Sequence, residues 1–119
     1  MKIKTTNTIL YCKKWQETVI FYKNLLILPV TFSNDWFVEF KLNETSCLSI
    51  ANEDKALINS SGGEGITITM EVDDIINIHL FLIEASTNPT PIKNHSWGAK
   101  VFNLYDPEGN RLEFWQKVI

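Results

Sequence analysis

Three alternate residues near the end of the chain, Arg111, Glu113 and Trp115, carry side chains that can bind a small molecule. They are separated by Leu112 and Phe114, and this period of two is typical of a half-buried strand, so the three side chains share the face opposite the core. On that face Glu113 could accept hydrogen bonds from a polar or cationic ligand, or act as a base. A structural carboxylate that pairs with Arg111 or with a lysine explains the same pattern, and the residues leave both interpretations open.

Aromatic residues supply a second feature of a ligand site. Rings on or beside predicted strands occur at Trp36, Trp97, Tyr105 and Trp115. Small-molecule sites are commonly lined by rings with a few polar groups. For any one tryptophan core packing is the favoured interpretation, except for Trp115, which shares the strand parity of Glu113. His79 is predicted in the middle of a helix and His95 in a loop, and for both residues a structural role is favoured over metal binding.

A hairpin positions Glu113. Its incoming strand alternates apolar and polar residues over 101–105, and the turn Asp106-Pro107-Glu108-Gly109-Asn110 joins it to the outgoing strand. In this turn the aspartate can cap the following backbone, the proline presets φ, and the glycine and the final asparagine tolerate positive φ. The turn therefore predicts two antiparallel strands with Glu113 in the middle of the second.

The rest of the chain reads as two similar halves on either side of Ser60–Gly65, whose composition indicates a flexible linker. In the first half we expect a strand over 4–12, a helix over 14–26 and strands over 30–32, 36–42 and 45–50. In the second half we expect a strand over 66–72, a helix from an Asp73 cap to Ala85 that buries Ile76, Leu80 and Ile83, a poorly patterned segment with Pro89 and Pro91, and the hairpin. This pattern predicts a single α+β domain, 1–119, of two βαβββ modules, about 1–60 and 65–119.

Two such modules side by side would form a curved mixed sheet with a concave pocket on the face away from the helices. Strand parity places these side chains on the concave face: Asn7, Ile9, Tyr11, Thr67, Thr69, Glu71, Arg111, Glu113 and Trp115. The polar face of the strand over 66–72 must then meet solvent or a ligand.

Composition excludes several classes of function. The net charge of -3 argues against nucleic-acid binding, because no basic surface would neutralise a line of phosphates. No apolar run approaches the roughly 20 residues that a membrane-spanning helix needs, and Lys2 and Lys4 precede only a short apolar strand rather than a signal peptide. Cys12 and Cys47 lie apart on predicted strands, as buried thiols in a reducing compartment do. We therefore expect a cytoplasmic protein that binds neither nucleic acid nor a membrane.

Two groups of motifs resemble the vicinal oxygen chelate superfamily, which includes glyoxalase I, fosfomycin and bleomycin resistance proteins and extradiol dioxygenases. The C-terminal motifs are Trp97-Gly98, the Asp106-Pro107-x-Gly109-Asn110 turn, and Glu113 beyond it. The N-terminal motifs are the strand Asn7 to Cys12, Phe21-Tyr22 and Leu25-Leu26. The resemblance covers nearly the whole chain and implies a ligand site on the concave face. The candidate ligand-binding residues are accordingly Asn7, Tyr11, Trp36, Thr67, Thr69, Tyr105, Arg111, Glu113 and Trp115, and the one candidate catalytic residue is Glu113.

The resemblance also implies positions for the divalent metal that catalytic members hold with histidine and glutamate. Those positions fall at Asn7, near Ser49, at Thr67 and at Glu113, and only Glu113 keeps a strong ligand. Asparagine and threonine oxygens are weak neutral donors for zinc, nickel or ferrous iron. We therefore expect no metal and no other cofactor.

Two hypotheses on function follow. The first is a metal-free protein that binds or sequesters a partly aromatic or cationic small molecule, as the antibiotic-resistance branch of the superfamily does. The alternative is a metal-dependent lyase, thiol transferase or dioxygenase that uses Glu113, with metal recruited through unexpected donors such as His95, or an enzyme that works without metal by acid–base chemistry. A non-catalytic interaction protein is a third reading. The family resemblance and the exposed strand edges of an open sheet both favour a homodimer.

Overall fold

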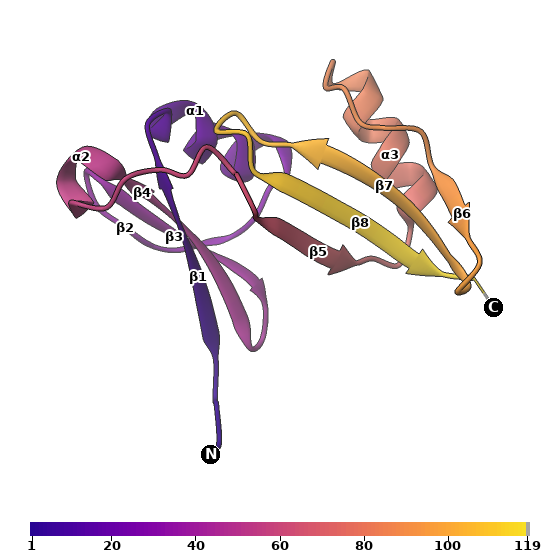
Figure 1. The fold of residues 1–119 in the computed structure, drawn as a ribbon, viewed down its shortest axis with the longest axis horizontal. Coiled ribbons are helices and arrows are strands. Elements are labelled where there is room, and N and C mark those ends of the chain that lie inside the picture. The colour runs from indigo at the N-terminus through magenta and orange to yellow at the C-terminus, as the bar shows by residue number, and fades with distance from the viewer. Residues whose placement is uncertain (119) are drawn as a thin grey trace. The chain divides into compact units, whose positions relative to one another are not determined.

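The computed structural model describes residues 1–118 and divides the chain into two compact units, Met1–Gly62 and Gly63–Ile119. The first unit contains β1 (Thr6–Cys12), α1 (Trp15–Ile20), the π-helical turn η1 (Phe21–Leu25), β2 (Val30–Ser33), β3 (Phe37–Asn43), β4 (Ser46–Asn52) and α2 (Glu53–Ala56). The second contains β5 (Thr67–Glu71), α3 (Ile75–Glu84), β6 (Lys93–His95), β7 (Ala99–Tyr105) and β8 (Arg111–Lys117) (Figure 1). No helix in residues 1–118 is long and apolar enough to span a bilayer.

Both units have the same topology. Each forms a four-stranded sheet, with the order β1-β4-β3-β2 in the first and β5-β8-β7-β6 in the second. In each sheet the first and last strands of the unit are parallel neighbours, and the other pairs are antiparallel. The predicted α+β fold of two βαβββ modules is thereby confirmed.

The core of the first unit lies between its sheet and α1. Alternate residues of β1, β3 and β4 are buried: Leu10, Cys12, Val38, Phe40, Leu48 and Ile50. Thr18, Phe21 and Tyr22 of the helical segment are also buried, and the Trp15 indole N–H donates to the Ile50 carbonyl at 2.9 Å. The helix predicted over 14–26 is α1 followed directly by the π-helical turn. We call the face of each sheet away from α1 or α3 its open face.

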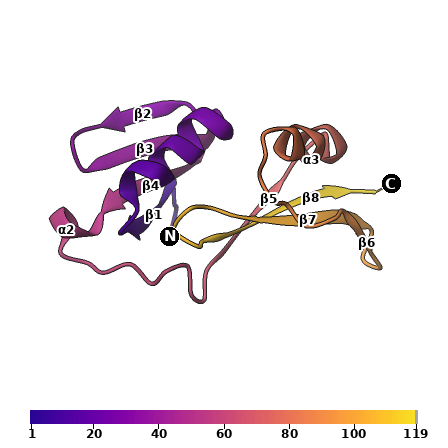
Figure 2. The same cartoon turned by 90° about the horizontal axis from the view of Figure 1, so that it is seen from above.

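In the second unit α3 lies on one face of the sheet (Figure 2) and buries Ile75 and Leu82 against the apolar side of β7 and β8. The predicted buried stripe is wrong, because Ile76, Leu80 and Ile83 are about half exposed. The helix begins after Asp74, whose side chain accepts from the Asn77 amide, one residue later than predicted. Because α3 is apolar on nearly every side, periodicity could not select the face that packs.

The turn that precedes β8 is held by a buried aspartate. Asp106 is 4% exposed, and its Oδ1 accepts from the backbone amides of Glu108 at 3.0 Å and Asn110 at 2.9 Å. Its Oδ2 accepts from the Asn110 amide side chain at 2.9 Å. A carboxylate can be buried here because these donors replace its hydration. The predicted hairpin and its turn chemistry are present as expected.

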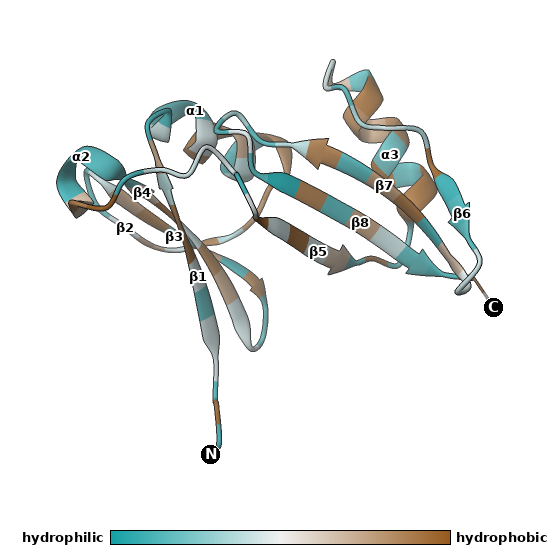
Figure 3. Ribbon diagram, in the orientation of Figure 1, coloured by the Kyte–Doolittle hydropathy of each residue, from teal (hydrophilic) through white to brown (hydrophobic). Residues whose placement is uncertain are grey.

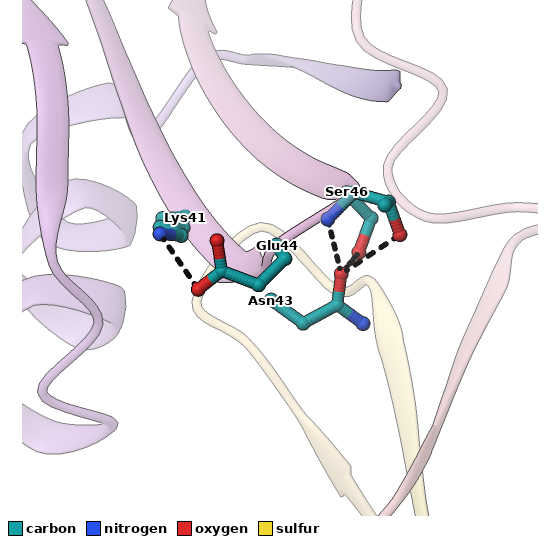
Figure 4. A network of polar contacts seen from close by, with 5 residues as sticks. Lys41, Asn43, Glu44 and Ser46 are labelled. Atoms are coloured by element: carbon teal, nitrogen blue, oxygen red, sulfur yellow. Dashed lines mark hydrogen bonds and ion pairs between the residues drawn. The ribbon is translucent and has the colours of Figure 1, made fainter. Parts of the chain in front are cut away.

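An asparagine organises the tight turn between β3 and β4 in a similar way (Figure 4). Asn43 Oδ1 accepts from the Thr45 amide at 3.0 Å and the Ser46 hydroxyl at 2.8 Å. Lys41 and Glu44 form an ion pair of 3.1 Å across the same turn. These contacts set the register in which β4 returns beside β3.

The segment predicted as a flexible linker is anchored at Gly63. This residue has φ +83, and a Cβ built on it would overlap the Gly109 carbonyl and the Asn110 amide of the β7–β8 turn. Its neighbour Gly62 also has positive φ, +66, but a Cβ there would meet no atom within 4 Å. The close approach of the turn backbone therefore requires glycine at position 63, whereas at position 62 only the positive φ favours glycine.

We expect Gly63→Ala to destabilise the protein by about 3 kcal/mol, because the methyl group both disfavours the left-handed backbone and overlaps the turn. Gly62→Ala is the matched control and should cost only about 1 kcal/mol, since it introduces the backbone strain without the overlap. Urea denaturation of the two variants measures the difference. Equal losses would show that the contact between Gly63 and the turn does not matter for stability.

Candidate functional site

The open face of the second sheet carries most of the predicted site residues. Cross-strand register places Thr69 beside Glu113 on one side and Asn103 beside Glu113 on the other. The same face includes Thr67 and Glu71 of β5, Tyr105 of β7, and Arg111 and Trp115 of β8. Figure 3 shows the alternation of hydrophilic and hydrophobic residues along β8 that separates this face from the core.

Glu113 uses only one of its two carboxylate oxygens. Thr69 donates its hydroxyl to Oε1 at 2.8 Å, and no residue in 1–118 donates to Oε2. Arg111 turns instead to Thr67, with Nη1 to Oγ1 at 3.2 Å, and forms no ion pair with Glu113. Within the described residues the carboxylate is therefore not neutralised by Arg111 or by a lysine. It retains an acceptor that a ligand could use.

Two tryptophan rings are in contact near the C-terminal end of β8. The ring centroids of Trp97 and Trp115 are 5.6 Å apart, and the two ring planes meet at 64°. Trp97 is 60% exposed. His95 contacts the Trp97 ring at 5.9 Å. Because Trp115 follows Glu113 by two residues, an exposed aromatic surface and a free acceptor share one face.

Asn103 is a residue of this face that was not among the predicted site residues. Its Oδ1 is buried and has no hydrogen-bond donor in residues 1–118. An orphaned carbonyl of this kind costs about 1–3 kcal/mol, so its presence calls for an explanation. The alternation of the hairpin already placed Asn103 opposite the core, and this was the signal that could have found it.

The backbone of Asn103 is held by Thr90. The Thr90 amide donates to the Asn103 carbonyl at 2.9 Å, and the Asn103 amide donates to Thr90 Oγ1 at 2.8 Å. Continuing the β6–β7 register would place Pro91 opposite Asn103, and proline has no N–H to donate. Thr90 therefore replaces a missing strand partner and fixes the position from which the Asn103 side chain projects.

His79 supports the same segment from α3. Its Nε2 lies 2.9 Å from the Thr90 carbonyl, and its ring meets Phe102 edge-on at 4.9 Å. These contacts give His79 a structural role, which is the role that the sequence favoured over metal binding.

On the open face of the first sheet, polar side chains pair with one another. Ser49 donates to Asn7 Oδ1 at 2.7 Å, and Asn7 Nδ2 donates to Glu39 Oε2 at 3.3 Å. Thr31 donates to the other oxygen of Glu39, Oε1, at 2.8 Å, from a β-bulge between Val30 and Phe32. We call Thr31, Glu39, Asn7 and Ser49 the polar chain; it connects all four strands.

Ser49 lies at the centre of the polar chain and is fully buried. Ser49 is on β4, with Ile9 of β1 on one side and Glu39 of β3 on the other in the register. The hydrogen bond between Asn7 and Glu39 therefore joins β1 and β3, the two strands that flank β4. The hydroxyl has its acceptor within the protein. Ser49 stands near the position at which the family resemblance implies a metal ligand on the fourth strand, and its hydroxyl donates to Asn7 instead.

The remaining predicted residues occupy different settings. Tyr11 is half-buried on the open face of the first sheet, opposite Ala51 in the register. Trp36 precedes β3 instead of beginning it, and its ring lies 5.5 Å from that of Phe37. Tyr105 is 59% exposed at the end of β7, beside Arg111.

The donor set does not fit a transition metal. No group of three His, Cys, Asp or Glu side chains in residues 1–118 is arranged to hold a metal ion. At the implied ligand positions Asn7 and Ser49 hydrogen-bond to each other and Thr67 accepts from Arg111. Neutral oxygens already engaged in hydrogen bonds compete poorly with water for such an ion.

We expect Asn7→Ala to cost about 1–3 kcal/mol of stability, because it leaves the buried Ser49 hydroxyl without an acceptor. Ser49→Ala combined with Asn7→Ala should cost less than the sum of the two single changes, since no orphaned hydroxyl then remains. Chemical denaturation of the wild type and the three variants gives the unfolding free energies for this double-mutant cycle. Additive losses would contradict the coupling of these two residues.

Solved structures of other proteins share this fold at low sequence identity. No family model matches the sequence, and no curated protein matches it. A lactoylglutathione lyase from Agrobacterium tumefaciens has 15% sequence identity and a TM-score of 0.78, over 93% of this chain and 91% of that one. A glyoxalase/bleomycin resistance protein/dioxygenase from Nocardioides has 15% identity and a TM-score of 0.80, over 99% of this chain and 85% of that one.

A bleomycin resistance determinant encoded on the transposon Tn5 has 14% identity and a TM-score of 0.75, over 95% of this chain and 97% of that one. At these identities the likeness concerns the fold. Because each of the three matches extends over both units, it agrees with the motifs at both ends of the chain. The chain therefore has the vicinal oxygen chelate fold, shared with glyoxalase and bleomycin resistance proteins.

Proposed function

We propose that this protein binds a small, partly aromatic or cationic molecule on the open face of the second sheet, in the cytoplasm. The observation that carries this proposal is the unused Oε2 of Glu113, on the same face as the Trp97–Trp115 pair. A carboxylate oxygen attracts a cationic N–H group, and an exposed indole offers a surface for a planar ring or a cation. The two features together favour a ligand that combines both.

The proposed mode of action is sequestration without a tightly bound transition metal. The donor set of the described residues supports this, because the implied ligand positions other than Glu113 hold neutral oxygens engaged in hydrogen bonds. The bleomycin resistance determinant among the structural neighbours supports a binding protein of this fold. The alternative, a metal-dependent lyase, would need donors from outside these positions.

We expect Glu113→Gln to weaken binding of benzamidine, a planar aromatic cation, about 10-fold. Glutamine still offers Thr69 an acceptor but carries no charge, so the ligand's N–H groups lose a charge-assisted partner. Because benzamidine is small, the wild-type dissociation constant should be on the order of 1 mM. An NMR titration that follows the indole N–H of Trp115 measures it.

Glu84→Gln is the matched control, since Glu84 is an exposed acid at the end of α3 in the same unit. It removes the same charge and should leave benzamidine binding unchanged. The proposal is overturned if neither the Trp97 nor the Trp115 signal responds to benzamidine. Stoichiometric nickel, zinc, manganese or iron in protein purified without chelator, measured by elemental mass spectrometry, would overturn its metal-free part.

We also propose that the protein is a homodimer. In the described sheets β1 and β2 are the edges of the first and β5 and β6 those of the second, and unpaired strand edges favour association. Apolar side chains on α3 are exposed too, with Leu80 at 51% and Phe81 at 46%. Sedimentation velocity at micromolar concentration should give twice the chain mass of 13.7 kDa. A monomer at that concentration would contradict the proposal.

A further inference from the structure

Two neighbouring residues on the open face of the second sheet each carry a side-chain oxygen without a donor among residues 1–118. Asn103 and Glu113 are directly opposite each other in the β7–β8 register. Their Cβ atoms are consequently about 5 Å apart, close enough for both side chains to reach one small group. In residues 1–118 no donor reaches Asn103 Oδ1 or Glu113 Oε2.

The first unit provides an internal comparison. Its register places Glu39 beside Ser49, as Asn103 is beside Glu113 in the second unit. There, Thr31 and Asn7 donate to the two carboxylate oxygens of Glu39, and Ser49 donates to Asn7. This sheet geometry therefore allows neighbouring acceptors to be satisfied when the chain supplies donors. Among the described residues of the second unit, only Thr69 donates to one of the three side-chain oxygens of Asn103 and Glu113.

We propose that Asn103 and Glu113 together accept hydrogen bonds from a ligand group that carries several N–H donors and a positive charge, such as an amidinium, a guanidinium or a primary ammonium. This inference rests on the proposed function and specifies its ligand. Asn103 Oδ1 is buried in this structure, so a ligand reaches it only after a half-turn about the last torsion of the side chain, which exchanges the amide oxygen and nitrogen with little change of shape. The charge of Glu113 provides the attraction, and Asn103 provides the second, neutral acceptor.

The placement of the aromatic residues agrees with this ligand class. Trp115 is two residues beyond Glu113 on the same face and contacts the Trp97 ring. A cationic group held at the two acceptors would leave the ring of an aromatic cation near these indoles, because alternate residues of a strand are about 7 Å apart. Arg111 precedes Glu113 on this face and hydrogen-bonds to Thr67 rather than to the Glu113 carboxylate.

The test is Asn103→Leu, because its effects on stability and on binding should have opposite signs. Leucine has a similar size and removes the orphaned carbonyl, so the melting temperature should rise by roughly 3 to 6 °C. Benzamidine binding should weaken about 10-fold, whereas binding of methyl benzoate, an aromatic ring without N–H donors, should not change. A purely structural asparagine would lower the melting temperature when replaced and would leave the ratio of the two affinities unchanged.

A second variant and a control keep the result interpretable. Asn103→Asp adds a second carboxylate and should strengthen benzamidine binding relative to methyl benzoate, the opposite of Asn103→Leu. Asn94→Leu makes the same substitution at an exposed position of β6 and should change neither affinity. If wild-type protein binds both probes equally, or if neither Asn103 variant alters their ratio, the inference fails while a general aromatic site remains. If neither probe binds, the proposed function fails as well.

Discussion

Every polar side chain on the open face of a sheet must find its hydrogen-bond partner in the protein, in water or in a ligand, and this constraint distinguishes the two units. Their ladders are the same, with a parallel pair formed by the first and last strands. In the first unit the polar chain satisfies its own donors and acceptors across four strands. In the second unit Thr69 donates to Glu113, and within residues 1–118 the side-chain oxygen of Asn103 has no donor. The same topology thus supports one face whose polar side chains hydrogen-bond to one another and one face on which, within residues 1–118, some acceptors have no donor.

The parts of the fold that could be predicted are those with local chemical causes. The β7–β8 turn depends on Asp106 capping the amides of residues within the same five-residue turn, so its signal is contained in that short stretch. Period-two alternation then assigns Glu113 and Trp115 to one face without knowledge of any partner strand. The repeated order of elements predicted the two modules for the same reason, since each strand and helix carries its own period.

Features that depend on distant residues were not predictable. The face of α3 is ambiguous because Ile76 and Leu80 are as apolar as the buried Ile75 and Leu82. The contact between Asn7 and Glu39 requires the order of strands in the sheet, and Thr31 reaches Glu39 only because a bulge turns it. Gly63 looked like a linker residue in sequence. Its role appears only when the turn with which it packs is in place.

Neutral residues at the positions where the sequence resemblance implies metal ligands have a structural consequence of their own. An empty cage of imidazoles and carboxylates would leave like charges and unpaired donors together, at a cost in stability. Asparagine and serine at the corresponding positions of the first unit instead form a 2.7 Å hydrogen bond with a fully buried hydroxyl. That bond stabilises the pairing of β1 with β4 without any ion. The proposed recognition then depends on the second unit, where within residues 1–118 Glu113 Oε2 and the side-chain oxygen of the neighbouring Asn103 have no donor.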